Sequence, residues 1–462
     1  MTKVIGIDLG TTFSAIASLD DLGNPEVLAS IEDNRKITAS AIYLKDNEVI
    51  VGDKALTYLK DQSNNVILQT KREMENDVVY STDQGKWVSD TDLVDAYTPA
   101  QVSALILKKL KEYTSDVKKV VITVPAMFAE KARQATLDAA KIADLEVIEL
   151  INEPTAAVLH YASLPGVEVG GRVMIFDLGG GTFDVTFAEV KNKKVDVLTS
   201  RGDKYLGGRD FDNEITKLMK KKYFDIHNVE IDIENNKQYL HKAEEVKKIL
   251  SVKDKANIEI NGPKGLQKIE ITQEEFEESI QTYIEKIKML IEEAMEASGM
   301  NPSRINQTLL VGGSTRMPII TKILTQMMGK PPVKGVNVDE AVVCGAAIYA
   351  GLKTEKETLS DQKQEALKEV NLTDVCNFYM GTLAYINDSH TNRKVVANTI
   401  IIERDTKLPV SVTKRYTTIS EGQEQLECNV TQSEGPEDNK EFVNIIHEEM
   451  LTLPKGRPAN QP

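Results

Sequence analysis

The stretch VMIFDLGGGT, Val173–Thr182, is the most informative part of the sequence, because an apolar run ends in an aspartate and a turn of three glycines. A similar stretch, VIGIDLGTT, spans Val4–Thr12 near the N-terminus. Each stretch predicts a buried strand and a tight turn, followed by a second strand, Phe183–Val190 or Phe13–Leu19. The two copies lie about 170 residues apart, which is too far for a solenoid and indicates a duplicated domain.

Two segments rich in small residues support this duplication. Glu153–Val158 carries a proline at the expected start of a helix, and Asp339–Ile348 contains a glycine and three alanines. Small side chains would let two such helices cross closely. We therefore expect a first lobe over residues 1–164 and a second lobe over residues 165–352.

Strands alternate with helices between the repeated segments. Lys119–Val124 and Thr308–Val311 have the apolar composition of buried strands, whereas Ala129–Ile142 has that of a helix. This alternation predicts an α/β fold with mainly parallel sheets.

The composition changes after the second lobe. Residues 353–375 form a charged segment and a linker. Beyond them, Val410–Thr413 and Leu426–Val430 alternate apolar and polar residues with a period of two, and polar turns separate the predicted strands. We therefore expect an all-β unit over residues 376–462.

The overall composition restricts the partners. The chain has 462 residues, 41% of them hydrophobic and 27% charged, and a formal net charge of -15. An acidic surface repels nucleic acids and anionic membranes, so we expect neither as a partner. The N-terminus lacks a secretory signal and no apolar run could span a bilayer, so we expect a cytoplasmic protein. The three cysteines, Cys344, Cys376 and Cys428, form no CxxC pair, which argues against a disulfide framework or a zinc site.

The two repeated turns together suit a nucleoside triphosphate. Tight glycine turns offer backbone N–H groups to phosphate oxygens, and Thr11 and Thr12 add hydroxyl groups. Asp8 and Asp177, at the strand ends, can hold a magnesium ion through its water shell. A single turn of this kind is usually only a turn, but a facing pair predicts that ATP is bound from both sides and hydrolysed.

Two further segments could contact the nucleoside. Gly312–Arg316 follows a predicted strand and precedes a helix, as phosphate and nucleoside cradles do, and Arg316 could stack on an adenine. Glu244, Lys247 and Ser251 share one face of a predicted helix. Taken alone, the first segment could equally be a plain loop, and the second is more often a solvated charged face.

Several motifs together resemble the DnaK-type heat-shock chaperones. They include Ile5–Thr12, Asn152–Ala157, Asp177–Val185 and Leu310–Pro318, with Arg133–Thr136 and Leu206–Gly208 in addition. The resemblance covers residues 1–352 closely and the remainder more loosely. It implies a duplicated actin-like ATPase domain, with two lobes around a nucleotide cleft, followed by a partial antiparallel β-sandwich that binds extended peptides.

The resemblance also implies roles for individual residues. Asp8 and Asp177 would organise magnesium and water, and Lys71 and Glu153 would flank the γ-phosphate, with Lys71 positioning the attacking water. The catalytic set is Lys71, Glu153, Asp8, Asp177 and Thr182. The ATP or ADP would be held by Gly10, Thr11, Thr12, Phe13, Gly179, Gly180, Gly181, Gly207, Gly208, Glu244, Lys247, Lys248, Ser251, Gly312, Gly313, Ser314, Arg316 and Asp339.

The sequence departs from the family pattern at several points. Phe13 replaces the usual Tyr or Asn, and Tyr205 and Arg209 replace the usual His and Glu. The linker Val370–Asp374 has two polar residues where the family has leucines, and each leucine no longer buried would lose about 1.5–3 kcal/mol of docking free energy. We therefore expect weakened coupling between the domains and a divergent bacterial branch of the family.

The C-terminal end also departs from the pattern. A further strand pair and a helical lid would follow Leu453–Pro458 in the family, whereas this sequence ends at Pro462. We therefore expect a truncated peptide-binding region with an unpaired sheet edge, which is a hazard for self-association.

The hypothesis that the sequence favours is a chaperone in which ATP controls the binding of unfolded polypeptides. A J-domain co-chaperone and a nucleotide exchange factor would be its partners. An ATP-dependent scaffold, a small-molecule kinase and a filament-forming actin relative are alternatives. The β-rich C-terminal unit argues against the last two.

Overall fold

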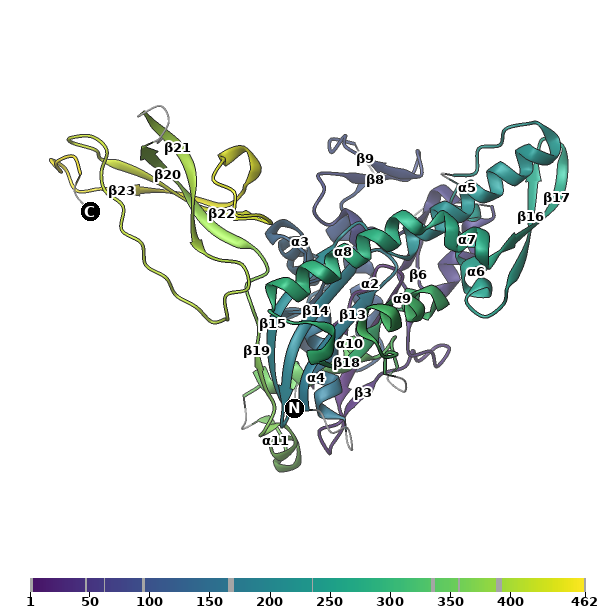
Figure 1. Cartoon of the computed structure of the whole chain (residues 1–462), viewed down its shortest axis with the longest axis horizontal. Helices are drawn as coiled ribbons and strands as arrows, with labels where there is room; N and C mark the ends of the chain where they lie inside the picture. Colours follow the sequence, from purple (N-terminus) through teal and green to yellow (C-terminus); the bar gives the residue numbers. More distant parts are fainter. Residues whose placement is uncertain are drawn as a thin grey trace.

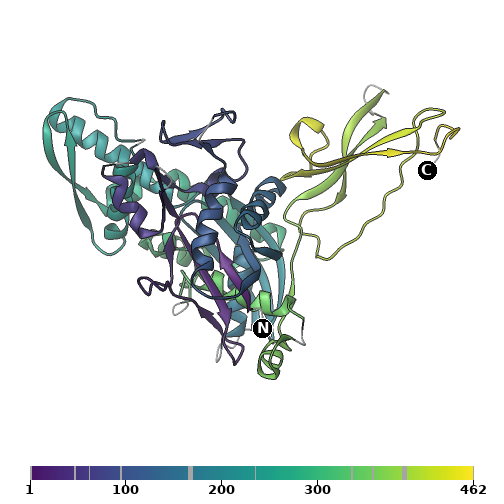
Figure 2. The same cartoon turned by 180° about the vertical axis from the view of Figure 1, so that it is seen from behind.

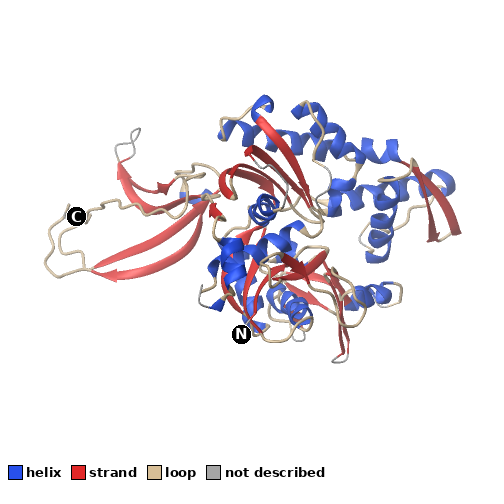
Figure 3. Ribbon diagram, turned by 90° about the horizontal axis from the view of Figure 1, so that it is seen from below, coloured by secondary structure: helices blue, strands red, loops and turns tan. Residues whose placement is uncertain are grey.

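The computed structural model describes residues 3–45, 48–61, 63–93, 96–164, 170–234, 236–333, 337–355, 358–387 and 393–460. Two α/β lobes lie side by side, and an antiparallel sheet projects from one end of the pair (Figures 1 and 3). Figure 2 shows the same arrangement from behind, with the N-terminal lobe toward the viewer. The expected two-lobed α/β architecture followed by a β-rich unit is therefore confirmed.

The first lobe is built on a sheet in which β1 and β2 form a hairpin and β11 lies parallel to β1. Strand order is β12-β11-β1-β2-β3, and β4 also pairs with β2. The strands are β1 (Lys3–Asp8), β2 (Phe13–Leu19), β3 (Pro25–Val27), β4 (Thr38–Ala39), β11 (Val117–Val124) and β12 (Glu146–Asn152).

The second lobe repeats this pattern. β13 and β14 form a hairpin, and β18 lies parallel to β13 in a sheet of order β18-β13-β14-β15-β19. The strands are β13 (Gly170–Leu178), β14 (Phe183–Lys191), β15 (Lys194–Asp203), β18 (Ile305–Val311) and β19 (Asn371–Thr373). The duplication read from the two hairpins is thus present in the strand pairing, and the last strand, β19, comes from the predicted linker.

Helices cover the two sheets, and smaller strand groups extend them. A capping box at Thr98 begins α2, and another at Thr272 begins α7. The hairpin of β16 and β17 lies at the end opposite to the C-terminal sheet (Figure 1).

The covering helices are α1 (Asp53–Leu56), α2 (Pro99–Lys111), α3 (Glu130–Ile142), α5 (Gly208–His227), α6 (Lys237–Leu250), α7 (Gln273–Ser279), α8 (Gln281–Ala297), α9 (Pro318–Met328) and α11 (Asp361–Leu367), with short 3-10 turns η3 (Thr70–Glu73) and η5 (Gly313–Arg316). The smaller strands are β5 (Ala41–Lys45), β6 (Glu48–Val51), β7 (Val66–Leu68), β8 (Val79–Ser81), β9 (Lys86–Val88), β10 (Ala96–Tyr97), β16 (Lys255–Gly262) and β17 (Gly265–Thr272).

The C-terminal unit is a four-stranded antiparallel sheet of order β21-β20-β22-β23. Its strands are β20 (Tyr379–Asn387), β21 (Lys394–Ile402), β22 (Gln425–Ser433) and β23 (Asn444–Thr452). The strand predicted around Leu426–Val430 is confirmed as part of β22. The strand predicted at Val410–Thr413 is wrong, because this segment crosses from β21 to β22 without pairing and most of its residues face solvent. An alternating pattern makes a strand only where a neighbouring strand accepts its hydrogen bonds.

Two helices cross between the lobes at very short range. α4 (Glu153–Ser163) packs on β13, β14 and β15 of the second sheet, whereas α10 (Ala341–Lys353) packs on β1, β2 and β11 of the first sheet. A Cβ atom added to Gly345 would lie 1.7 Å from the Ala156 carbonyl oxygen, and one added to Gly6 would lie 2.2 Å from the Ala347 nitrogen. The predicted close crossing is confirmed, and it ties each lobe to the other.

Gly345→Ala should destabilise the protein, because the new methyl group meets rigid backbone of α4. Overpacking of this kind costs about 1–3 kcal/mol or more. We expect a midpoint of thermal unfolding lower by several degrees. Gly435→Ala is the matched control, since its methyl group would meet only the flexible carboxylate of Glu437 at 3.0 Å. Equal midpoints for the two variants would show that the helix crossing tolerates a side chain.

Candidate active site

The turns of the two hairpins meet at their tips. A Cβ atom on Gly180 would lie 2.0 Å from Thr12 Oγ1, and one on Gly181 would lie 2.7 Å from Thr11 Cγ2. Only glycine lets the turns approach this closely. The predicted facing pair is therefore present, and each turn closes against the other.

A cluster of buried charges lies beneath these turns. Lys71, in η3, forms an ion pair with Glu153, the first residue of α4. Burial raises the pKa of the Asp8, Glu153 and Asp177 carboxyls above their ordinary values. Burial opposes the charge on Lys71, but the carboxylates of Glu153 and Asp8 outweigh it and raise the pKa of the amine.

Asp184 adds a fourth carboxylate that residue-by-residue reasoning did not select. It lies opposite Asp177 in the β13–β14 pairing, and its Oδ2 accepts a hydrogen bond from the Ala126 nitrogen over 3.2 Å. Burial, reinforced by the charge of Glu153, raises its pKa to about 7. The available signal was a carboxylate near the start of Phe183–Ala188, whose other residues are apolar or carry a hydroxyl group.

This donor set fits a hydrated magnesium ion. Three buried carboxylates and the half-buried Asp8 lie around Lys71, and a divalent cation would relieve their mutual repulsion. Within the described ranges, no three His, Cys, Asp or Glu side chains converge closely enough to hold a metal ion directly. Binding through the water shell is the mode that suits both observations, since magnesium keeps several of its waters.

Glycines from three segments converge beside the hairpin of the second lobe. The Gly208 nitrogen donates to the Gly179 carbonyl over 3.0 Å, and the Ser314 hydroxyl donates to the same oxygen over 2.9 Å. Gly312 has φ of 83°, and a Cβ atom there would lie 2.5 Å from the Leu178 carbonyl oxygen. The structure thus brings together the predicted glycine segments at 179–181, 207–208 and 312–313.

The predicted residues of α6 lie next to these glycines. Lys247 Nζ donates to the Gly208 carbonyl and pairs with Asp212, both over 2.8 Å. Burial favours the protonated form of Glu244, but the nearby His241 and Lys248 side chains outweigh it and lower its pKa to about 2. Glu244 is therefore ionised and available to accept hydrogen bonds.

Other predicted residues make contacts of their own. Lys248 Nζ lies 5.7 Å from the centroid of the Phe13 ring, which joins α6 to the first hairpin. Arg316 pairs with Asp339, so the two side chains predicted for the nucleoside side are adjacent. The Ser251 hydroxyl donates to the Lys247 carbonyl over 2.9 Å and is used within its own helix.

Polar contacts hold the two lobes against each other. Arg72 pairs with Asp210 over 3.2 Å, and Lys204 pairs with Glu75. Lys237, at the start of α6, donates to the Val66 carbonyl over 2.8 Å, to the Ser63 carbonyl over 3.0 Å and to the Tyr80 hydroxyl. Burial and then the nearby charge of Arg209 lower the pKa of Lys237 to about 7.

The linker is docked on the second lobe. β19 pairs with β15 in parallel, and the Leu372 side chain packs against an apolar cluster that includes Val195 and Leu367. Asn371 faces solvent. The Asp374 carboxylate accepts hydrogen bonds from Asn152 and Thr155, both over 3.1 Å. Backbone pairing therefore holds this segment despite its polar residues.

An arginine joins the second lobe to the C-terminal unit. Arg201, on β15, donates from both terminal nitrogens to the Asp405 carboxylate, over 3.1 and 2.9 Å, and from Nε to Glu293 over 2.7 Å. Arg404 donates to the Ser200 carbonyl over 3.1 Å, and Gln432 accepts from the Glu130 nitrogen over 3.0 Å. The sheet thus contacts both lobes.

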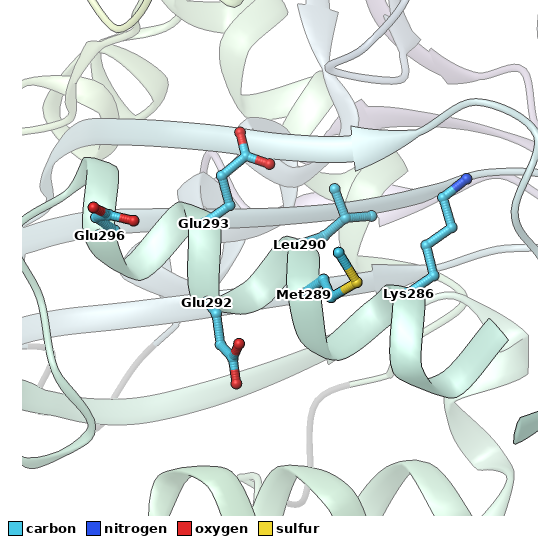
Figure 4. Close-up of a pocket in the computed structure, with 6 residues that line it drawn as sticks. All are labelled: Lys286, Met289, Leu290, Glu292, Glu293 and Glu296. Carbon is cyan, nitrogen blue, oxygen red and sulfur yellow. The ribbon is translucent and has the colours of Figure 1, made fainter. Parts of the chain in front are cut away.

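A shallow groove lies on α8, near this junction (Figure 4). It has a volume of about 410 Å³ and is lined by Lys286, Met289, Leu290, Glu292, Glu293 and Glu296. None of these is a predicted nucleotide residue, and Glu293 is the one that pairs with Arg201.

Comparison with known proteins agrees with this geometry. The family model described as "Hsp70 protein" matches residues 4–459. The chain belongs to the Hsp70 family. It is 34% identical over 488 aligned residues to a protein named "Chaperone protein dnaK" from Thalassiosira pseudonana, and the match covers 99% of this chain and 77% of the relative.

Membership of the Hsp70 family settles the class of activity. The protein is an ATPase that uses ATP and Mg²⁺ and acts as an ATP-dependent chaperone for unfolded polypeptides. The scaffold and kinase alternatives are not favoured by this relationship. In the part of the chain that the structure describes, no helix combines the length and apolar character needed to cross a bilayer.

The low pKa of Lys237 predicts a pH dependence of stability. The folded value of about 7 lies below the ordinary value of 10.5, so the folded protein holds fewer protons than the unfolded chain between these limits. The free energy of unfolding of the Hsp70 protein should therefore rise with pH across this window, and Lys237→Met should remove that rise. Urea unfolding at about pH 7 and about pH 9.5 measures this change in the free energy of unfolding.

Lys253→Met is the control for this experiment, because Lys253 is exposed on the same lobe. We expect the control to keep the wild-type pH dependence. If Lys237→Met also keeps it, the Lys237 amine has an ordinary pKa in the folded protein.

Proposed function

We propose that the buried charge cluster beneath the two hairpins is the site of ATP hydrolysis. The observation that carries this proposal is the ion pair of Lys71 with Glu153, placed among Asp8, Asp177 and Asp184 where the glycine turns meet. Magnesium bound there supplies positive charge to the phosphates. The chain itself orients the groups and excludes bulk water.

The catalytic residues then have distinct tasks. Lys71 directs its ammonium group at the γ-phosphate and holds the attacking water, and Glu153 holds Lys71 and orients that water. Asp8 and Asp177 hold the waters of the magnesium ion. Thr182, which is buried at the turn of the second hairpin, offers its hydroxyl group to the phosphates.

The remaining predicted residues bind the nucleotide. Backbone N–H groups of the glycine turns bind phosphate oxygens, and the charged residues of α6 and η5 surround the nucleoside. Two groups do this work: Gly10, Thr11, Thr12, Gly179, Gly180, Gly181, Gly207, Gly208 and Gly312 on the phosphate side, and Phe13, Glu244, Lys247, Lys248, Ser251, Gly313, Ser314, Arg316 and Asp339 on the other. Their proximity in the fold supports this assignment.

Lys71→Ala should lower the rate of ATP hydrolysis by about 10²–10³-fold, because it removes a charge that stabilises the transition state. Nucleotide affinity should change little. Single-turnover hydrolysis and titration with a fluorescent ATP analogue measure the two quantities. Lys60→Ala is the control, since Lys60 is exposed in the same lobe. Unchanged turnover in Lys71→Ala would refute the assigned role.

We also propose how the nucleotide state reaches the peptide-binding unit. We divide the chain into residues 1–164, 165–352, 353–375 and 376–462, so that the linker strand β19 connects the second lobe to the C-terminal sheet and pairs with β15 of that lobe. A shift of the second lobe would therefore displace Asp405, which is paired with Arg201, and the linker, which is paired with β15. A J-domain co-chaperone and a nucleotide exchange factor would act on this switch. We also propose that the protein is cytoplasmic, which cell fractionation would test.

Arg201→Ala should reduce the difference in peptide affinity between the ATP and ADP states at least fivefold. The substitution leaves Asp405 and Glu293 without their shared partner, and breaking a buried ion pair costs about 3–5 kcal/mol, with less expected here because Asp405 is partly exposed. Titration of a fluorescent extended peptide in both nucleotides measures the effect. Arg304→Ala, at an exposed position, is the control. An unchanged affinity ratio would show that coupling bypasses this ion pair.

A further inference from the structure

A small cavity adjoins Lys71 where the two lobes meet. Its volume is about 10 Å³, close to the least that holds one water molecule. Residues of the first lobe form one side and residues of the second lobe the other. The lining residues are Lys71, Arg72, Glu75 and Phe128 from the first lobe, and Lys204 and Tyr205 from the second.

The cavity lies between the buried centre and the surface. Phe128 and Lys71 are only 4% and 7% exposed, whereas Tyr205 is 43% exposed. The Lys71 ammonium group is therefore the inner end and the Tyr205 ring is the outer end. An opening at Tyr205 would connect the charge cluster to solvent by a short path.

The lining is suited to an anion. It contains three cationic side chains, Lys71, Arg72 and Lys204, and one carboxylate, Glu75. Each cation has an acidic partner that an arriving anion could displace, since Arg72 pairs with Asp210 and Lys204 with Glu75. A doubly charged phosphate would meet successive donors along this path.

The side chain of Tyr205 closes the outer end. Its ring lies 5.8 Å from the Arg72 guanidinium carbon and 5.5 Å from Lys204 Nζ, and its hydroxyl donates to Asn76 Oδ1 over a long 3.4 Å. Weak contacts of this kind let an exposed ring rotate away rapidly.

The direction between the two glycine turns is obstructed. The glycine turns touch at Gly180 and Thr12 and again at Gly181 and Thr11. A phosphate leaving between the turns would have to wait until the lobes separate. The path past Tyr205 needs a side-chain rotation, the exchange of two ion pairs and the release of the hydrogen bond from Arg72 to the Tyr205 carbonyl.

We propose that inorganic phosphate leaves the active site through this cavity and that Tyr205 is its gate. The proposal rests on the proposed role of Lys71 at the γ-phosphate. Hydrolysis breaks the bond between the β- and γ-phosphates and yields ADP and inorganic phosphate. The phosphate then passes from Lys71 to Arg72 and Lys204 without any further covalent step, while ADP stays between the lobes.

Single-turnover kinetics of the full chain test the gate. Acid quenching of radiolabelled ATP measures bond cleavage, and a fluorescent phosphate-binding protein measures release into solvent. Tyr205→Ala should shorten the delay between cleavage and release at least threefold, with the cleavage rate within twofold of wild type. Tyr205→Trp should lengthen this delay, or create one if the wild type shows none.

Tyr385→Ala is the matched control, because Tyr385 is an exposed tyrosine of the C-terminal sheet. Its delay should equal that of the wild type. Identical delays in wild type, Tyr205→Ala and Tyr205→Trp would overturn the proposal. So would cleavage and release that change in parallel, since Tyr205 would then act on lobe closure.

The experiment separates this proposal from the proposed function. Normal cleavage in Lys71→Ala would refute the role of Lys71, whatever the Tyr205 variants show. Loss of cleavage in Lys71→Ala with unaltered delays in both Tyr205 variants would refute only the exit path. Unfolding midpoints and ATP affinities of all variants verify that each one is folded.

Discussion

The backbone contact between α4 and α10 is the constraint on which the structure depends. Each helix belongs to one half of the duplicated chain but packs on the sheet of the other half, and Gly345 lies directly against the Ala156 carbonyl. The lobes are therefore coupled through rigid backbone. Since α4 begins with Glu153 immediately after β12, the same packing also positions the carboxylate that holds Lys71.

Without its ligands, the charge cluster lowers the stability of the folded protein, because it contains ionised carboxylates out of contact with water. Burial raises the pKa of Asp8, Asp177 and Asp184 because ionised carboxylates lose their hydration there. A magnesium ion that arrives with the triphosphate would relieve that penalty, because its positive charge favours the ionised carboxylates. η3 carries both Lys71 and Arg72, and Arg72 forms an ion pair with Asp210 of the other lobe. A displacement of Lys71 at the phosphates would therefore also act on a contact that holds the lobes together.

The route to the C-terminal sheet depends on backbone pairing and on charge. β15 pairs with β14 on one side and with the linker strand β19 on the other, so the linker extends the sheet that carries Asp177. The backbone hydrogen bonds of this pairing do not depend on the polar side chain of Asn371, which faces solvent. Strand pairing and the ion pair of Arg201 with Asp405 therefore hold this junction in addition to the burial of Leu372.

The sequence by itself determined the features that depend on local chemistry. The glycine turns, the aspartates at the strand ends and the periodicity of β11, α3 and β22 are properties of neighbouring residues, and they sufficed for the duplicated fold and the ATPase class. The family resemblance selected Lys71, but only the tertiary structure decided that it forms an ion pair with Glu153, where Asp184 lies and which lobe α10 covers. It also decided that Val410–Thr413 is not a strand. These depend on contacts between residues far apart in the chain, whose partners no local pattern specifies.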